Sequence, residues 1–207
     1  MTRHGPYRLV RFWGASLLVL VMLSACWSPA AARLSSAGKS IHLPAIWRLL
    51  ALQNGDFESG ETAWQYTSSG YHIILNKAGL SGITPHSGDW AVWMGGAWNE
   101  TDTLTQSVSI FPGATYLVYW RWILSEETNC GADYTRVLVN GMVLKQDPLC
   151  VTTTEAGWSS HWIDLHAYSG SAITLQFMAH TDNRQASDSN SSLYLDDISL
   201  QAAAPAP

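Results

Sequence analysis

Short runs of alternating apolar and polar residues, separated by turn-forming residues, most limit how this chain can fold. Gly, Pro, Asn and Asp bound these runs, and an apolar period of 3.6 residues is almost absent. A period of two places successive side chains on opposite faces of a strand, which is typical of sheets packed on a core. The pattern therefore predicts an all-β sandwich, with an Asn-Gly hairpin turn in "VNGM". The clearest strands are residues 89–95, 103–110, 115–124, 135–141, 161–165, 172–180 and 193–200.

Residues 1–25 have the features of an export signal. Cationic residues precede a short apolar run, "FWGASLLVLVML", which is followed by "LSAC". The run is too short to span a bilayer comfortably. "LSAC" resembles the bacterial lipobox, whose cysteine becomes the first mature residue and is lipidated. This resemblance predicts a lipid anchor at Cys26 and a location at the cell membrane or cell surface. The alternative is an ordinary signal cut near residues 28–32, which discards Cys26 and secretes the chain.

The rest of the chain fits one domain. With 207 residues, 47% of them hydrophobic, it can bury one sizeable core. We expect an anchor and linker at residues 26–50, the sandwich at residues 51–201 and a disordered tail at residues 202–207. The formal net charge of −5 argues against a nucleic-acid partner. We expect the exported domain to be a monomer.

Three cysteines occur in the sequence, and two remain once Cys26 is assigned to the signal or anchor. Disulfides persist in exported proteins, so Cys130 and Cys150 are predicted to pair. The alternative is two free buried thiols, although both cysteines lie in polar, turn-rich segments. In the chain-entropy description, a crosslink that closes a loop of this length stabilises the folded state by roughly 3 kcal/mol.

Several motifs, taken in order, resemble those of galactose-binding-like jelly-roll domains. They are "NGDFESG", "HSGDWAVWMGG", "LTQSVSIFPGATYLVYW", "VLVNG", "WIDLHAYSGSAITLQFMAHTD" and "LYLDDISL", and they cover residues 54–200. Each motif is weak alone, but their order and spacing are specific. The resemblance implies a jelly-roll sandwich of two antiparallel sheets. Such domains are similar to bacterial carbohydrate-binding modules and to accessory domains of secreted bacterial proteases and glycosidases.

The resemblance also implies a structural calcium where the first and last strands lie side by side. Glu58 and Asp196 match the ligand positions of the family, and Asp56 is a weaker candidate. Calcium takes about 6 to 8 oxygen ligands, which carboxylates and backbone carbonyls can supply. Strand alternation sends Asp196 and Asp197 to opposite faces, so only one of them turns toward the ion. The alternative is that these residues form a polar turn and a solvated strand end.

Strand alternation also gives candidate outward faces. In residues 115–124, Arg121 marks its own face as the one exposed to water. In residues 172–180, a core set of Ile173, Leu175 and Phe177 leaves the alternate residues outside. The outward candidates are Trp93, Tyr119, Arg121, Gln176 and His180.

These outward residues form a candidate sugar-binding surface if they share one sheet. Sugar recognition needs an aromatic plane and hydrogen-bonding side chains, and the set supplies both. Trp98, in the loop "GGAWNETD", is a further stacking candidate. The alternative is that Trp93 and Tyr119 pack under a loop or sheet edge, while Arg121 pairs with Glu126 or Glu127.

No catalytic motif accompanies these residues. The sequence lacks G-x-S-x-G, H-E-x-x-H and phosphate-binding glycine loops, and its histidines are scattered without metal-ligand spacing. We therefore expect no enzyme activity. The expected function is carbohydrate binding at the cell surface by a lipid-anchored, non-catalytic sandwich. The alternative is a structural or protein-interaction accessory domain with no sugar site.

Overall fold

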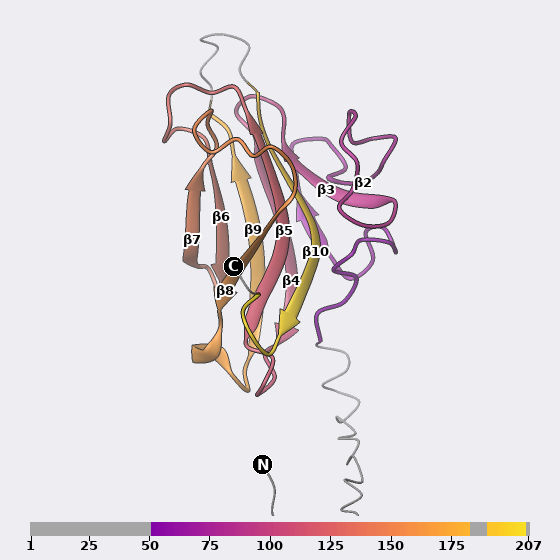
Figure 1. The fold of residues 1–207 in the computed structure, drawn as a ribbon, viewed down its shortest axis with the longest axis vertical. Helices are drawn as coiled ribbons and strands as arrows, with labels where there is room; N and C mark the ends of the chain where they lie inside the picture. The colour runs from indigo at the N-terminus through magenta and orange to yellow at the C-terminus, as the bar shows by residue number, and fades with distance from the viewer. Residues whose placement is uncertain (1–50, 183–189, 206–207) are drawn as a thin grey trace, which may run out of the picture. The chain divides into compact units, whose positions relative to one another are not determined.

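The computed structural model describes residues 51–182 and 190–205, which fold as two antiparallel five-stranded sheets packed face to face (Figure 1). The strand order is β1-β4-β9-β6-β7 in the first sheet and β2-β3-β10-β5-β8 in the second. The predicted all-β sandwich is confirmed. The strands are β1 (Gln65–Thr67), β2 (Ile74–Asn76), β3 (Trp90–Gly95), β4 (Thr101–Ser109), β5 (Tyr116–Ser125), β6 (Tyr134–Val139), β7 (Met142–Pro148), β8 (Ser159–Asp164), β9 (Ala172–His180) and β10 (Ser191–Gln201).

The single helical segment within these two ranges is a 3-10 turn, η1 (His166–Tyr168). No helix of the described residues is long and apolar enough to cross a membrane. The predicted export signal, Cys26 and residues 27–50 of the linker lie outside the described residues. The anchor, the signal and the domain boundaries therefore stay predictions.

Each of the seven expected strands is present, and three further strands complete the sheets. β1 and β2 have only three residues each, too few for an alternating pattern to be visible. β7 follows the expected Asn-Gly turn, in which Asn140 and Gly141 have φ of 52° and 79°. Such left-handed conformations are typical of two-residue turns between antiparallel strands.

The core lies between the two sheets. β9 buries Ile173, Leu175 and Phe177 there, as predicted, and β3 buries Val92 and Met94. Removing apolar surface from water favours folding by about 25 cal/mol per Å², so these inward faces stabilise the sandwich.

The segment that enters the sandwich lies along β10, the last strand. Ile198 donates its N–H to the carbonyl of Gly55 at 2.8 Å. A Cβ at residue 55 would come within 1.9 Å of the Ile198 carbonyl oxygen, so only glycine allows this close approach. The segment before β1 and the last strand are thus neighbours. The first strand itself, β1, pairs with β4 in the other sheet, so the expectation that the first and last strands lie side by side is wrong.

A second hydrophobic cluster lies on the outer face of the second sheet. Leu80, from the segment between β2 and β3, is buried against Ala91 and Tyr194. Trp158 also holds this segment, because its indole N–H donates to the Thr84 carbonyl at 2.8 Å. The tryptophans of this cluster therefore contribute to packing. The partly buried members of the cluster are Leu75, Ile83, Trp93, Trp122, Leu124 and Trp158.

Cys130 and Cys150 form the predicted disulfide, with Cα atoms 5.2 Å apart. Cys130 lies between β5 and β6, and Cys150 follows β7. The crosslink therefore closes a loop that contains the whole β6–β7 hairpin.

Candidate functional site

The residues predicted to form one sugar-binding surface belong to both sheets. Trp93, Tyr119 and Arg121 are in the second sheet, on β3 and β5, whereas Gln176 and His180 are on β9 in the first. In a sandwich the two outer faces point in opposite directions. The predicted shared surface is therefore wrong.

The prediction for β5 is also wrong because its faces are reversed. Tyr119 is only 1% exposed, within the core. Arg121 is buried beside it, and its guanidinium donates to Asp147 at 2.6 Å and to Glu155 at 2.9 Å. Burial alone would raise the pKa of Glu155. The hydrogen bonds from His161 and Arg121 together outweigh burial and lower the pKa to about 2. Since two carboxylates neutralise the arginine, a charged side chain can occupy the interior face.

Gln176 and His180 do point outward, but they take part in the polar outer face of the first sheet. Gln176 donates to the hydroxyl of Thr105 at 3.3 Å. The Nδ1 atom of His180 lies 2.8 Å from the Thr101 hydroxyl, and its ring lies beside Tyr134. Both residues therefore have partners in neighbouring strands.

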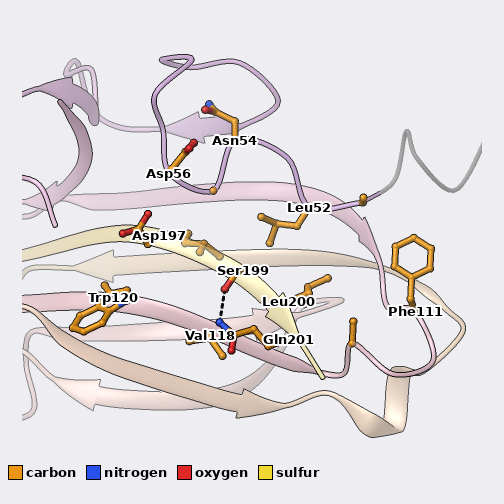
Figure 2. Close-up of a pocket in the computed structure, with 14 residues that line it drawn as sticks. Leu52, Asn54, Asp56, Phe111, Val118, Trp120, Asp197, Ser199, Leu200 and Gln201 are labelled. Atoms are coloured by element: carbon orange, nitrogen blue, oxygen red, sulfur yellow. Dashed lines mark hydrogen bonds between the residues drawn. The ribbon is translucent and has the colours of Figure 1, made fainter. Parts of the chain in front are cut away.

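A groove of about 680 Å³ runs along β10 and β5 (Figure 2). Figure 2 shows Trp120 and Phe111 toward opposite ends of this groove, with β10 between them. His86 covers one face of Trp120, with ring centroids 3.7 Å apart. The residues that line the groove are Ala51, Leu52, Asn54, Gly55, Asp56, Phe111, Ala114, Val118, Trp120, Asp197, Ile198, Ser199, Leu200 and Gln201.

The polar side chains of the groove are largely occupied by one another or by the backbone. Asn54 donates to two carbonyls, of Gly60 at 2.8 Å and of Thr62 at 2.9 Å. Both carboxylate oxygens of Asp197 have partners, one in His86 and the other in the Ser87 hydroxyl. A ligand in this groove would have to compete with bonds that already hold the fold together.

A smaller hollow, here called the loop pocket, has a volume of about 430 Å³. One wall is the segment between β1 and β2 with Leu75 of β2, and the other is the end of β3 with the loop after it. The residues that line it are Gly70, Tyr71, His72, Ile73, Leu75, Trp93, Gly95, Gly96, Ala97 and Asp102. None of these residues is Lys or Arg, so the described lining carries no fixed positive charge.

Trp93 is held firmly in the wall of the loop pocket. Its indole stacks on Tyr194, with centroids 5.8 Å apart, and donates an N–H to the Ser192 hydroxyl at 3.1 Å. Gly96 lies against the indole with φ of 78°, and a Cβ there would come within 2.8 Å of the ring. Glycine at this position therefore keeps the wall in place.

Asp102 lies at the base of the loop pocket. Its Oδ2 accepts the N–H of Gly95 at 2.6 Å. Its Oδ1 is buried and receives no hydrogen bond from the described residues. Burial raises the pKa of Asp102 to about 6, and the neighbouring carboxylate of Glu100 adds to this effect. A buried acceptor without a donor is uncommon in folded proteins.

Two exposed aromatic side chains lie at or beside the pocket. Tyr71, 63% exposed, is part of its wall, and Trp98, 44% exposed, directly follows the lining residue Ala97. The sequence pointed to Trp93 and Trp98 but not to Tyr71, His72 or Asp102. Besides these two tryptophans, the sequence marks the region with the pair Gly95-Gly96, where β3 ends.

Glu58 and Asp196, the predicted calcium ligands, bind the same loop before β3. Glu58 accepts N–H groups from Asp89 and Trp90 at 2.8 and 2.9 Å. Asp196, fully buried, accepts the Ser87 N–H at 3.1 Å. Burial raises the pKa of Asp196 to about 7. Both carboxylates thus accept backbone N–H groups, and a calcium ion would have to share their oxygens with these donors.

The arrangement departs from the prediction at Asp197. A bulge interrupts β10 after Asp196, and Asp197 has φ of 45°. Both aspartates therefore bind Ser87, rather than pointing to opposite faces. Asp56 is exposed and lines the groove. No group of three His, Cys, Asp or Glu side chains within residues 51–182 and 190–205 is placed to hold a metal, so a calcium here would need backbone oxygens.

Comparisons with known proteins agree on the fold. No protein-family model matches the chain, and no curated protein matches its sequence. TmCBM61, solved in complex with beta-1,4-galactotriose, matches with a TM-score of 0.51 and 18% identity, over 72% of this chain and 95% of its own. The predicted sandwich of two antiparallel sheets is therefore confirmed at the level of fold.

Two further solved structures match less closely. The K2 cleaved adhesin domain of Lys-gingipain has a TM-score of 0.47 and 18% identity, over 69% of this chain and 95% of that domain. A family 16 carbohydrate binding module has a TM-score of 0.42 and 17% identity, over 73% of this chain and 98% of that module.

Proposed function

We propose that this chain is an exported, non-catalytic module that binds carbohydrate in the loop pocket. The observation that supports the proposal best is the placement of Trp93 and Tyr71 in the walls of one hollow of about 430 Å³. That volume is within the usual range for small-ligand pockets, roughly 300–1,000 Å³. Aromatic walls suit the apolar C–H faces of a pyranose ring, and His72 with the backbone of residues 95–97 offers polar contacts at the edge.

The charge of the pocket favours an uncharged sugar. Its described lining contains Asp102 and His72 but no Lys or Arg, and His72 is already paired with Glu61 at 2.7 Å. A uronic acid or sulfated sugar would bring a negative charge toward a carboxylate without a compensating cation. The neutral beta-1,4-galactotriose bound by TmCBM61 is therefore a sensible first probe.

Titration calorimetry with beta-1,4-galactotriose and other neutral oligosaccharides, beside polygalacturonate fragments, tests the proposal. Tyr71→Ala and Trp93→Ala should each weaken binding by about ten-fold or more, because stacking area is lost. The matched control is Trp120→Ala, since Trp120 is also half-buried on the second sheet and stacked on an aromatic partner, but lines the groove. It should bind as the wild type does.

Three outcomes would contradict this assignment. Loss of binding in Trp120→Ala but not in Tyr71→Ala would move the site to the groove. Stronger binding of the acidic fragments would refute the preference for uncharged sugars. Failure of the wild type to bind any glycan at millimolar concentration would favour the structural or protein-interaction domain.

We further propose that Cys26 carries a lipid that holds the module at the cell surface, and that calcium binds between Glu58 and Asp196. The first proposal follows from "LSAC" after an apolar run. Expressed in a bacterium with its own signal, the wild type should partition into detergent and Cys26→Ser should not. A soluble wild-type chain that begins after Cys26 would refute the anchor.

A further inference from the structure

Two carboxylates are buried side by side beneath the loop pocket. Glu100 is 2% exposed and Asp102 is 1% exposed. Glu100 directly precedes β4, and Asp102 is the second residue of β4. Side chains two residues apart in an extended chain lie on the same face, which brings the two carboxyl groups together.

Glu100 holds the first wall of the pocket. Its Oε1 accepts the N–H of Ser69 at 2.7 Å, and its Oε2 accepts the Ser69 hydroxyl. The Ser68 hydroxyl also reaches Oε1, at 3.5 Å. Ser68 and Ser69 directly precede the wall residues Gly70 and Tyr71, so Glu100 fixes where this wall begins.

Asp102 holds the second wall through the N–H of Gly95. Its other oxygen, Oδ1, is the buried acceptor without a donor. The polar side chains that act on Asp102 are those of Ser68 and Glu100. The Ser68 hydroxyl lies 3.5 Å from Glu100 and near enough to Asp102 to lower its pKa, but it makes no hydrogen bond of good geometry to Oδ1. Glu100 as a carboxylate can only accept. One proton between the two carboxyl groups would therefore complete the hydrogen bonding.

Among the described residues, no Lys or Arg forms an ion pair with either of the two carboxylates, Glu100 and Asp102. The titratable groups nearby are Tyr71 and His72 in the wall, with His72 turned to Glu61, and Asp182, whose carbonyl accepts the N–H of Asn99. Two adjacent buried negative charges are strongly unfavourable, whereas a pair that shares one proton carries a single charge.

We propose that Glu100 and Asp102 share one proton that ties the two walls of the loop pocket together, so that glycan binding weakens when this proton leaves for solvent. The regulation rests on the proposed function of the same pocket. On deprotonation the pair changes from one negative charge to two, and repulsion separates the Ser68–Ser69 wall from β4. Affinity should therefore be higher at pH 5 than at pH 8.

The pKa values of the two groups locate the proton. Burial and the neighbouring Glu100 raise the pKa of Asp102 to about 6. Burial also raises the pKa of Glu100, but the hydrogen bonds from Ser69 outweigh this and lower it. The proton is therefore bonded to Asp102, which donates a hydrogen bond to the carboxylate of Glu100.

Amide hydrogen exchange tests the shared proton without any ligand. Protection factors, corrected for the intrinsic pH dependence of exchange, should fall by about ten-fold or more for the amides of Ser69 and Gly95 between pH 5 and pH 8. The control is the Ile123 amide, which donates to Glu155 at 2.8 Å. Its acceptor has a pKa of about 2 and does not titrate in this range.

Asp102→Asn sharpens the test because an amide can accept from Gly95 and donate permanently to Glu100. Protection should then be independent of pH, and the affinity for beta-1,4-galactotriose should not fall at pH 8. Unchanged protection in the wild type, or retained pH dependence in Asp102→Asn, would overturn the proposal. Calcium that restores wild-type protection at pH 8 would mean that a metal ion, not a proton, joins the pair. Changed protection without glycan binding at any pH would refute the proposed function alone.

Discussion

The groove and the loop pocket differ in how their polar groups are satisfied. The groove is larger, about 680 Å³ against about 430 Å³, yet its Asn54 and Asp197 already bind the surrounding chain. The loop pocket is smaller, with Trp93 and Tyr71 in its walls and a buried carboxylate oxygen without a donor beneath it. Volume alone is therefore a poor guide to function. Polar groups without partners are more informative because folding normally satisfies them.

The polar groups of the groove lie where the segment of residues 51–56 meets β10, and we call this meeting point the structural junction. Residues 51–56 enter the sandwich beside β10, and the Ile198 N–H binds the Gly55 carbonyl there. Asp197 fixes the loop before β3 through His86 and Ser87. These bonds join segments that are far apart in sequence. A change in the groove should therefore alter stability, whereas a change in the loop pocket should alter binding.

The largest expected effect is on stability, from replacing either of two stacked tryptophans. Trp93→Ala and Trp120→Ala should each lower the free energy of unfolding by roughly 2–4 kcal/mol, somewhat less than for a fully buried tryptophan. Urea unfolding followed by far-ultraviolet circular dichroism would measure both losses. Only Trp93→Ala should also lose glycan affinity. If Trp120→Ala unfolds at the wild-type urea concentration, the groove is not the structural junction described here.

Calcium should raise the stability of the fold without changing glycan binding in the loop pocket. If the ion binds the folded state through Glu58 and Asp196, calcium at 100 times its dissociation constant should stabilise the fold by about 2.7 kcal/mol. Glu58→Gln and Asp196→Asn should abolish most of that gain in thermal melts with calcium or chelator. Glycan affinity should not change, because the walls of the loop pocket are held by Glu100 and Asp102 instead. Identical wild-type melts with and without calcium would refute the site.

The next effect concerns pH and has a defined sign. The folded-state pKa of Asp102 is raised from its ordinary 3.8 to about 6, mainly by burial. Its contribution to stability is therefore fully present below pH 3.8 and is lost as the pH rises through about 6. Asp102→Asn lacks this dependence and should be more stable than the wild type by about 1–2 kcal/mol at pH 8. Unfolding free energies at pH 5 and pH 8 would measure the difference, and a variant less stable at pH 8 would contradict it.

The fold was accessible from the sequence wherever a strand has one apolar and one polar face. β9 is such a strand, and its core residues were predicted correctly. β5 is apolar or aromatic on both faces, so Arg121 decided the assignment and reversed it. Its partners Asp147 and Glu155 lie 26 and 34 residues further along the chain. Only the folded structure shows that they bring enough negative charge to bury an arginine.

The candidate site was less accessible than the fold. Trp93 and Trp98 stand out in the sequence as aromatic residues, but Tyr71 and Asp102 lie some 30 residues apart and meet only because β1 pairs with β4 and β2 with β3. Whether the Oδ1 atom of Asp102 has a hydrogen-bond donor depends on how several segments pack around it. No local pattern records it.

The smallest expected effect concerns Trp98, the exposed tryptophan beside the loop pocket. Its side chain is 44% exposed and no ring contact ties it to the described part of the sandwich, so Trp98→Ala should change the free energy of unfolding by less than about 0.5 kcal/mol. Because Ala97 lines the pocket, the indole can reach a glycan that extends past the pocket mouth. Losing that contact should weaken binding of a trisaccharide by about five-fold, as expected for about 1 kcal/mol of stacking, and should leave a monosaccharide unaffected. Calorimetry with galactose and beta-1,4-galactotriose would separate the two cases. Equal losses for both sugars would place Trp98 inside the pocket, and no loss for either would leave Trp93 and Tyr71 as the aromatic contacts of the site.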